Sequence, residues 1–118
     1  MSYPFDVNGE TVWDAGHLTG RMYASLAHGA AEALNLETGL TANRQGGCDV
    51  EPPIFRSFVE GLYNAYSSTK NPVLHGITHS LLACSTILAE RVGFQIAMAP
   101  EHEDALQAER ADFTRAMS

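Results

Sequence analysis

Basic residues are scarce in this sequence. Seven Lys and Arg stand against 14 Asp and Glu, and the formal net charge is −7. Proteins that bind nucleic acid use Lys and Arg to displace the counterions of the phosphates, and helices that lie on membrane surfaces carry a basic polar face. The sequence has no basic stripe of either kind, so we expect neither nucleic acid nor a membrane as a partner.

Long hydrophobic runs and leader segments are also missing. No segment approaches the ~18 uninterrupted apolar residues of a membrane-spanning helix, and "MSYPFDVNGE" lacks the basic and apolar regions of a secretory signal. The sequence therefore predicts a cytoplasmic protein. Its two cysteines, Cys48 and Cys84, are expected to be reduced there. A disulfide between them stays open, because sequence does not give their separation in space.

The sequence does contain enough hydrophobic residues to form one core. With 118 residues and 45% hydrophobic residues, the chain is long enough for a single domain. We assign residues 1–98 to this domain. Residues 99–118 form an acidic tail that is a candidate helix, with a thin apolar stripe through Leu106, Phe113 and Met117.

Local signals predict an α+β fold in which an N-terminal β-hairpin packs on three main helices. Asn8-Gly9 lies between two apolar arms and is typical of a two-residue hairpin turn. The expected helices cover residues 14–36, 53–67 and 72–92, and the last two begin at a proline. Residues 37–52 are predicted to be a long loop. The segment "FQIAM" (94–98) is a candidate third strand beside the hairpin.

Helical periodicity predicts which faces are buried. In the first helix the large residues are assigned to the core: Leu18, Met22, Leu26, Ala33 and Leu34, with Tyr23 at their edge. In the third helix the predicted core face is Val73, Leu74, Ile77, Leu81, Leu88 and Val92, with Cys84 at its edge.

Small residues form further stripes beside these predicted core faces. They are Gly20, Ala24, Ala27 and Ala31 on the first helix and Gly76, Ser80 and Ala83 on the third. Small side chains let another backbone approach closely, although Ala is also simply the best helix former. We predict these residues as the interface of a homodimer.

Two histidines in "PVLHGITHSLLAC" are the clearest candidate metal ligands. His75 and His79 are four residues apart on a predicted helix, a spacing that lets two imidazoles share a metal ion. Metalloprotease helices carry a Glu directly after the first His, whereas here Gly76 follows. Further ligands would have to come from His17 or from the 37–52 loop. The alternative, a solvated or interface face, is favoured, and we predict no cofactor.

The loop segment "QGGCDVE" is the nearest approach to a catalytic group. Cys48 follows two glycines, and Asp49 and Glu51 point roughly the same way in an extended chain. A nucleophile needs a base and an orienting group, and no G-x-S-x-G elbow or phosphate-binding loop occurs. The same residues also have a non-catalytic explanation: Cys48 is a structural thiol, and Asp49 or Glu51 places a negative charge at the N-terminus of the next helix.

Three stretches resemble a known family: "YPFDVNGETVW", "CDVEPPIFRSFVEGL" and "LAERVG". They are similar to an uncharacterised family of small actinobacterial proteins, a domain of unknown function, over roughly residues 1–98. The resemblance implies a bacterial cytoplasmic setting and no catalytic residues.

The sequence thus predicts a non-enzymatic interaction or assembly protein, homodimeric through helix faces and able to bind a protein partner. One alternative is a small ligand-binding or metal-dependent enzyme that uses His75, His79, Cys48, Asp49 and Glu51. Another is an immunity-like inhibitor, since an acidic protein suits a basic partner.

Overall fold

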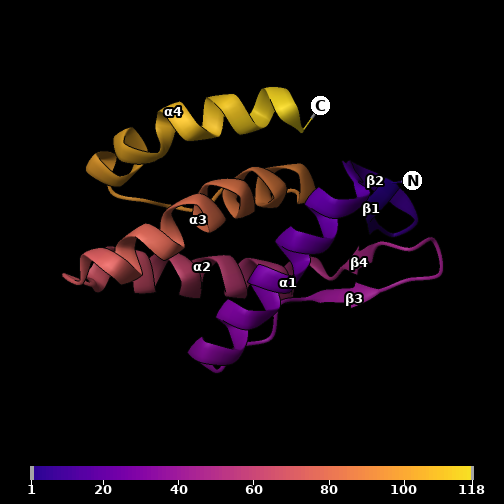
Figure 1. Cartoon of the computed structure of the whole chain (residues 1–118), viewed down its shortest axis with the longest axis horizontal. Helices are drawn as coiled ribbons and strands as arrows, with labels where there is room; N and C mark the ends of the chain where they lie inside the picture. Colours follow the sequence, from indigo (N-terminus) through magenta and orange to yellow (C-terminus); the bar gives the residue numbers. More distant parts are fainter. Residues whose placement is uncertain (1, 118) are drawn as a thin grey trace.

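Four strands and four helices make up the computed structural model, which describes residues 2–117 (Figure 1). In chain order they are β1 (Ser2–Val7), β2 (Glu10–Gly16), α1 (His17–Leu34), β3 (Leu40–Ala42), β4 (Cys48–Val50), α2 (Pro52–Ser68), α3 (Pro72–Val92) and α4 (Pro100–Ala116). This is an α+β fold, as predicted. In Figure 1, α3 lies between α2 and α4, α1 crosses in front of α2, and the strands gather at one end.

The predicted hairpin is confirmed, and it belongs to a larger sheet. Asn8 and Gly9 form its turn with φ angles of 52° and 84°, the left-handed values that a two-residue turn requires. The sheet has the order β2-β1-β4-β3, with β1 antiparallel to β2 and parallel to β4. β3 and β4 form a second hairpin within residues 37–52, where we predicted only a loop. Each has just three residues, too few to show an alternating pattern.

The predicted strand at residues 94–98 is wrong. This segment has no regular structure and connects α3 to α4 alongside α2. There the Arg56 guanidinium lies over the ring of Phe94, 5.1 Å from its centroid, and Ile96 is buried. Its apolar residues therefore pack against a helix, while β1 already has a strand on each side.

Three aromatic rings from the hairpin and α1 make the centre of the core. Phe5 stacks on Trp13 at a centroid distance of 4.9 Å, and Tyr23 meets both rings edge-on at 5.8 Å. The Tyr23 hydroxyl pairs with the Ser85 hydroxyl of α3 at 2.7 Å, in a fully buried site. This hydrogen bond ties α1 and the hairpin to the central helix.

The buried face of α1 is the opposite of the predicted one. Its buried residues are Gly20, Tyr23, Ala24, Ala27 and Ala31, whereas Leu18, Met22 and Leu26 are 70%, 55% and 57% exposed. The cause is the short distance between α1 and β1. A Cβ atom at Gly20 would lie only 2.6 Å from the Tyr3 side chain, so the strands supply large side chains and the helix must supply small ones.

The other two main helices match the prediction better. On α2 helical periodicity predicts a core face of Ile54, Phe55, Phe58, Val59, Leu62, Tyr63 and Tyr66. The buried residues Phe55, Phe58, Val59, Leu62 and Tyr66 all belong to it. On α3 the prediction holds for Leu81 and Leu88 and fails in the first two turns, where Val73 and Ile77 are exposed. By length and composition α3 is apolar enough to cross a membrane, but half of the relevant window is buried in the fold, as in a core helix.

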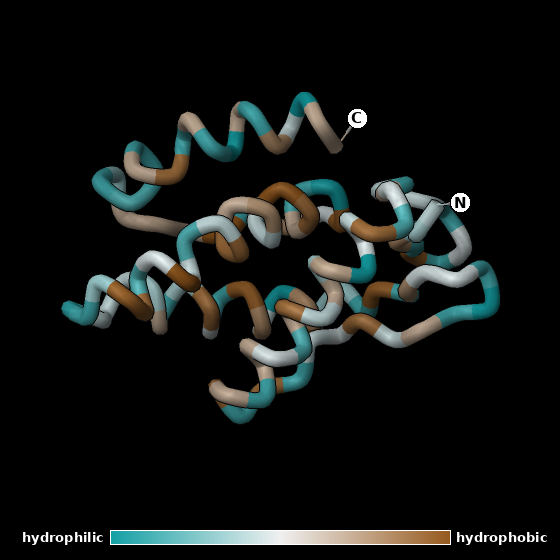
Figure 2. Tube along the Cα trace, in the orientation of Figure 1, coloured by the Kyte–Doolittle hydropathy of each residue, from teal (hydrophilic) through white to brown (hydrophobic). Residues whose placement is uncertain are grey.

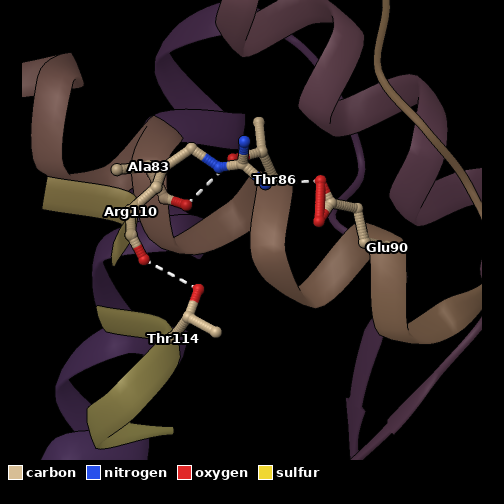
Figure 3. Close-up of polar contacts among 5 residues, drawn as sticks. All are labelled: Ala83, Thr86, Glu90, Arg110 and Thr114. Carbon is tan, nitrogen blue, oxygen red and sulfur yellow. Dashed lines mark hydrogen bonds and ion pairs between the residues drawn. The ribbon is translucent and has the colours of Figure 1, made fainter. Parts of the chain in front are cut away.

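α4 is a regular helix that has several polar contacts and little buried apolar surface. Figure 2 shows it mainly in hydrophilic colours beside the more hydrophobic α3, and Leu106 is its one fully buried residue. Arg110 pairs with Glu90 of α3 and presents its carbonyl oxygen to Thr114, as Figure 3 shows. Next to Glu90 on α3, the Arg91 guanidinium donates to the carbonyl oxygens of Val12 and Met117, at 3.3 and 2.5 Å.

The small face of α1 can be tested at Gly20. Gly20→Ala places a methyl group against Tyr3, and we expect it to lower the free energy of unfolding by about 1–3 kcal/mol, the usual cost of overpacking a core. Glu32→Ala, at an exposed position of the same helix, is the matched control and should change that energy by less than about 0.5 kcal/mol. Urea denaturation measures both. Equal stability of the two variants would contradict the close approach.

The docking of the C-terminal end of α4 can be tested at Arg91. Arg91→Met keeps the apolar stem and removes both hydrogen bonds, so we expect the free energy of unfolding to fall by about 1–3 kcal/mol. Amide hydrogen exchange in the last turns of α4 should rise as well. Arg115→Met is the control, because Arg115 is exposed and pairs only with Asp112 of its own helix. Unchanged exchange in the Arg91 variant would show that these bonds do not hold α4.

Candidate interaction surface

The two candidate metal ligands on α3 are both engaged by one tyrosine. The ring of Tyr66 stacks on His75 at a centroid distance of 4.1 Å, and its hydroxyl pairs with Nδ1 of His79 at 3.2 Å. Nε2 of His79 lies 3.5 Å from a carboxylate oxygen of Glu109 on α4. Each imidazole therefore has a protein partner that positions it.

A second tyrosine–histidine pair lies beside this one. The Tyr63 hydroxyl accepts a hydrogen bond from the backbone N–H of Ala99 at 2.9 Å and is 2.8 Å from Nδ1 of His102. A hydroxyl oxygen can accept two hydrogen bonds and donate one, so either the Tyr63 hydroxyl or Nδ1 of His102 can be the donor of this pair. His17 lies elsewhere, next to Tyr3. Among residues 2–117 no three His, Cys, Asp or Glu side chains gather as a metal site, and the histidine cluster joins α4 to α2 and α3.

The candidate catalytic residues in β4 and directly after it point in different directions. Cys48 is buried, with its sulfur 3.2 Å from the Tyr3 hydroxyl, and burial raises the pKa of its thiol. Asp49 and Glu51 are exposed, because successive residues of a strand face opposite sides. Cys48 and the two carboxylates therefore lie on opposite sides of this segment and do not converge on one point.

Asp49 has a structural partner instead. The side-chain amide of Asn43 donates to Asp49 at 3.1 Å and to the buried Asp6 at 3.4 Å, while its carbonyl oxygen accepts from the backbone N–H groups of Gln45 and Gly47. Thr11 also donates to Asp6, at 2.7 Å. The amide thus separates two carboxylates on neighbouring strands and fixes the β3–β4 turn.

The predicted small-residue interface is divided between the core and the surface. Gly20, Ala24, Ala27 and Ala31 are buried within the chain, and so is Ala83. A second subunit cannot reach these five residues, which is a correction to the prediction. Gly76 and Ser80 of the same predicted set are exposed on α3, and both remain available.

The exposed surface holds a different apolar area, which we call the α1–α3 face. Six of the seven large hydrophobic side chains that are exposed among residues 2–117 belong to it, and they are 41–70% exposed. They are Leu18, Met22 and Leu26 of α1 and Val73, Leu74 and Ile77 of α3. Sequence reasoning named every one of them but placed them in the core.

Two adjoining hollows run along this face between α1 and α3. One, of about 520 Å³, lies between Leu18, Met22 and Leu26 on one side and Cys84 and Phe113 on the other. The second, of about 410 Å³, continues toward Gly29, Ala33, Leu74 and Ile77. They share Leu26, Ser80 and Leu81, so they form one groove, and no charged residue lines either hollow.

The sequence did contain an indication of this exposed face, because α1 has apolar residues on more of its circumference than one core can cover. Large residues occupy one side of that helix and small ones another, so either side fits a core. The deciding information is the aromatic content of the hairpin, because Tyr3, Phe5 and Trp13 already fill the space that large helical side chains would need.

Both thiols should be unreactive in the folded protein. Burial raises the pKa of Cys84 from 9.0 to about 12 and also raises that of Cys48, so neither supplies much thiolate at pH 8. We expect Ellman's reagent to label neither thiol within minutes at pH 8 and both in denaturant. The folded state also holds these protons more tightly than the unfolded chain, so stability should fall as the pH rises from about 9 toward 12. Rapid labelling of folded protein would contradict this.

Comparison with known proteins gives one match. No curated protein and no solved structure matches the chain. The match to the family covers residues 1–118, so it includes α4, which the sequence resemblance had left outside. The chain therefore belongs to DUF6086, a family of unknown function.

Proposed function

We propose that this protein is a non-enzymatic interaction and assembly module that self-associates through the α1–α3 face. The observation that supports the proposal is the set of large hydrophobic side chains left in solvent on α1 and α3. Met22 and Leu26 could have been polar without loss to the fold, because the buried face of α1 lies on its other side.

The size of the face suits an interface. At their observed exposures the six side chains present on the order of 600 Å² of apolar surface, the upper limit of what the largest patch on a typical monomer shows. A standard interface buries about 800 Å² on each partner. The polar residues that border the groove would form the rim of the interface and add part of the remaining area. They are Thr19, Ser25 and Ser80.

The charge of the protein makes self-association more favourable at the α1–α3 face than at other parts of its surface. The chain carries a net charge of −7, so two copies repel each other across most orientations. The groove is lined by uncharged residues only, and α4 carries acidic residues away from it, with Glu101 and Glu103 in its first turn. Two copies that meet face to face therefore bury no like charges.

The oligomeric state tests the proposal directly. We expect the wild type to sediment as a dimer at tens of micromolar in analytical ultracentrifugation. Met22→Glu places a charge in the groove and should give a monomer with unchanged secondary structure, because position 22 is 55% exposed and Glu is a good helix former.

The matched control adds the same charge elsewhere. Ala111→Glu is at an exposed position of α4 and should remain a dimer. A wild-type monomer at 100 µM, or equal dissociation of both variants, would count against self-association through this face.

A further inference from the structure

Two glycines on the exposed side of the helices have no role within one chain. Four glycines lie inside α1, α2 and α3. Gly20 is required, since an added Cβ would lie 2.6 Å from the Tyr3 side chain, and at Gly61 an added Cβ would displace the end of the Leu36 side chain. At Gly29 and Gly76 an added Cβ meets nothing within 4 Å. A glycine inside a helix destabilises it by roughly 0.5–1 kcal/mol relative to Ala, and nothing in the single chain compensates for that cost.

Gly29 belongs to a stripe of α1 that changes from large to small residues. Residues 18, 22, 26, 29 and 33 recur at spacings of four, four, three and four, which is the spacing of one helix face. They are Leu, Met, Leu, Gly and Ala, and all five line the groove. The N-terminal half of the stripe is therefore raised and the C-terminal half is hollow.

We propose that α1 of one copy lies antiparallel to α1 of a second copy across this face, with the two-fold axis next to Leu26. The inference rests on the proposed self-association and specifies its geometry. An antiparallel pair centred at this point places Leu18 on Ala33 and Met22 on Gly29 of the second copy, and the same contacts repeat on the other side of the axis, as a two-fold interface requires.

Volume distinguishes this arrangement from a parallel one. In a parallel pair Leu18 would meet Leu18, and Gly29 would meet Gly29, so one end would be overfilled and the other empty. Packing at interfaces matches the density of protein interiors, which excludes such gaps. In the antiparallel pair every contact along the stripe joins a large residue to a small one, except at the axis.

The groove has the length and the walls to receive α1 of the second copy. The stripe from residue 18 to residue 33 extends about 22 Å at 1.5 Å per residue, and the two hollows follow the same residues. Leu74 and Ile77 of α3 form the far wall, so the incoming helix contacts both α1 and α3.

Disulfide trapping tests the arrangement. In a Cys84→Ser background, which removes the half-buried native thiol of the groove, we expect Leu26→Cys to form a covalent dimer under mild oxidation. Met22→Cys mixed with Gly29→Cys should crosslink as a heterodimer. Leu18→Cys is the control and should not crosslink with itself, because the two copies of this residue lie about 22 Å apart in the antiparallel pair, beyond the reach of a disulfide.

Gly29→Leu gives a second measurement that does not depend on oxidation. It fills the space reserved for Met22 of the second copy, and we expect a roughly 10- to 100-fold increase in the dimer dissociation constant. The thermal stability of the monomer should not fall, because position 29 faces open space. Gly29→Ala should weaken the dimer less.

The outcomes separate this inference from the proposed function. A dimer that crosslinks through Leu18→Cys and not through Leu26→Cys would overturn the antiparallel pairing while self-association stands. A Gly29→Leu variant that dimerises as tightly as the wild type would overturn it too. A wild-type protein that stays monomeric would remove the proposed function, and this inference with it.

Discussion

The close contact between α1 and β1 is the constraint on which the rest of the structure depends. Tyr3, Phe5 and Trp13 fill the space under the helix, so only small residues and Tyr23 fit on its inner side. Interiors are packed at nearly constant density, and large residues on the strand therefore require small ones opposite. The large residues of α1 are left on the outside, where they make the α1–α3 face.

The polar contacts divide the molecule into a tightly packed part and a more loosely attached helix. The Tyr23–Ser85 hydrogen bond is buried between α1 and α3, where losing one partner would leave the other unsatisfied. The contacts of α4 are mostly partly exposed: Arg110 with Glu90, His79 with Glu109, and Tyr63 with His102. Exposed ion pairs contribute little each, so α4 depends on Leu106 and on Arg91 for much of its attachment.

Much of the fold could be predicted from the sequence, because its signals are local. Asn8-Gly9 defines the hairpin, Pro72 and the capping Asn71 define the start of α3, and the period of α2 identifies its buried face. The β3–β4 hairpin could not be predicted, since its three-residue strands are stabilised by pairing with β1, more than 30 residues away in the sequence.

For the candidate interaction surface, prediction from the sequence was limited in a different way. The residues of the α1–α3 face were recognised as an apolar stripe, but periodicity alone does not say whether a stripe contacts its own chain or a second one. The histidines were correctly placed on one helix, yet their partners Tyr66 and Glu109 come from other helices. Only the arrangement of α2, α3 and α4 shows which side chains the imidazoles contact.

The buried bond between Tyr23 and Ser85 has a consequence for synthesis on the ribosome. The two residues are 62 positions apart, so at about 5–20 residues per second roughly 3–12 s pass between their translation. During that interval α1 can already rest on the hairpin, but its tyrosine hydroxyl has no partner and the core between α1 and α3 is still open. The nascent chain is therefore most exposed to premature association, and to chaperones, before α3 has emerged.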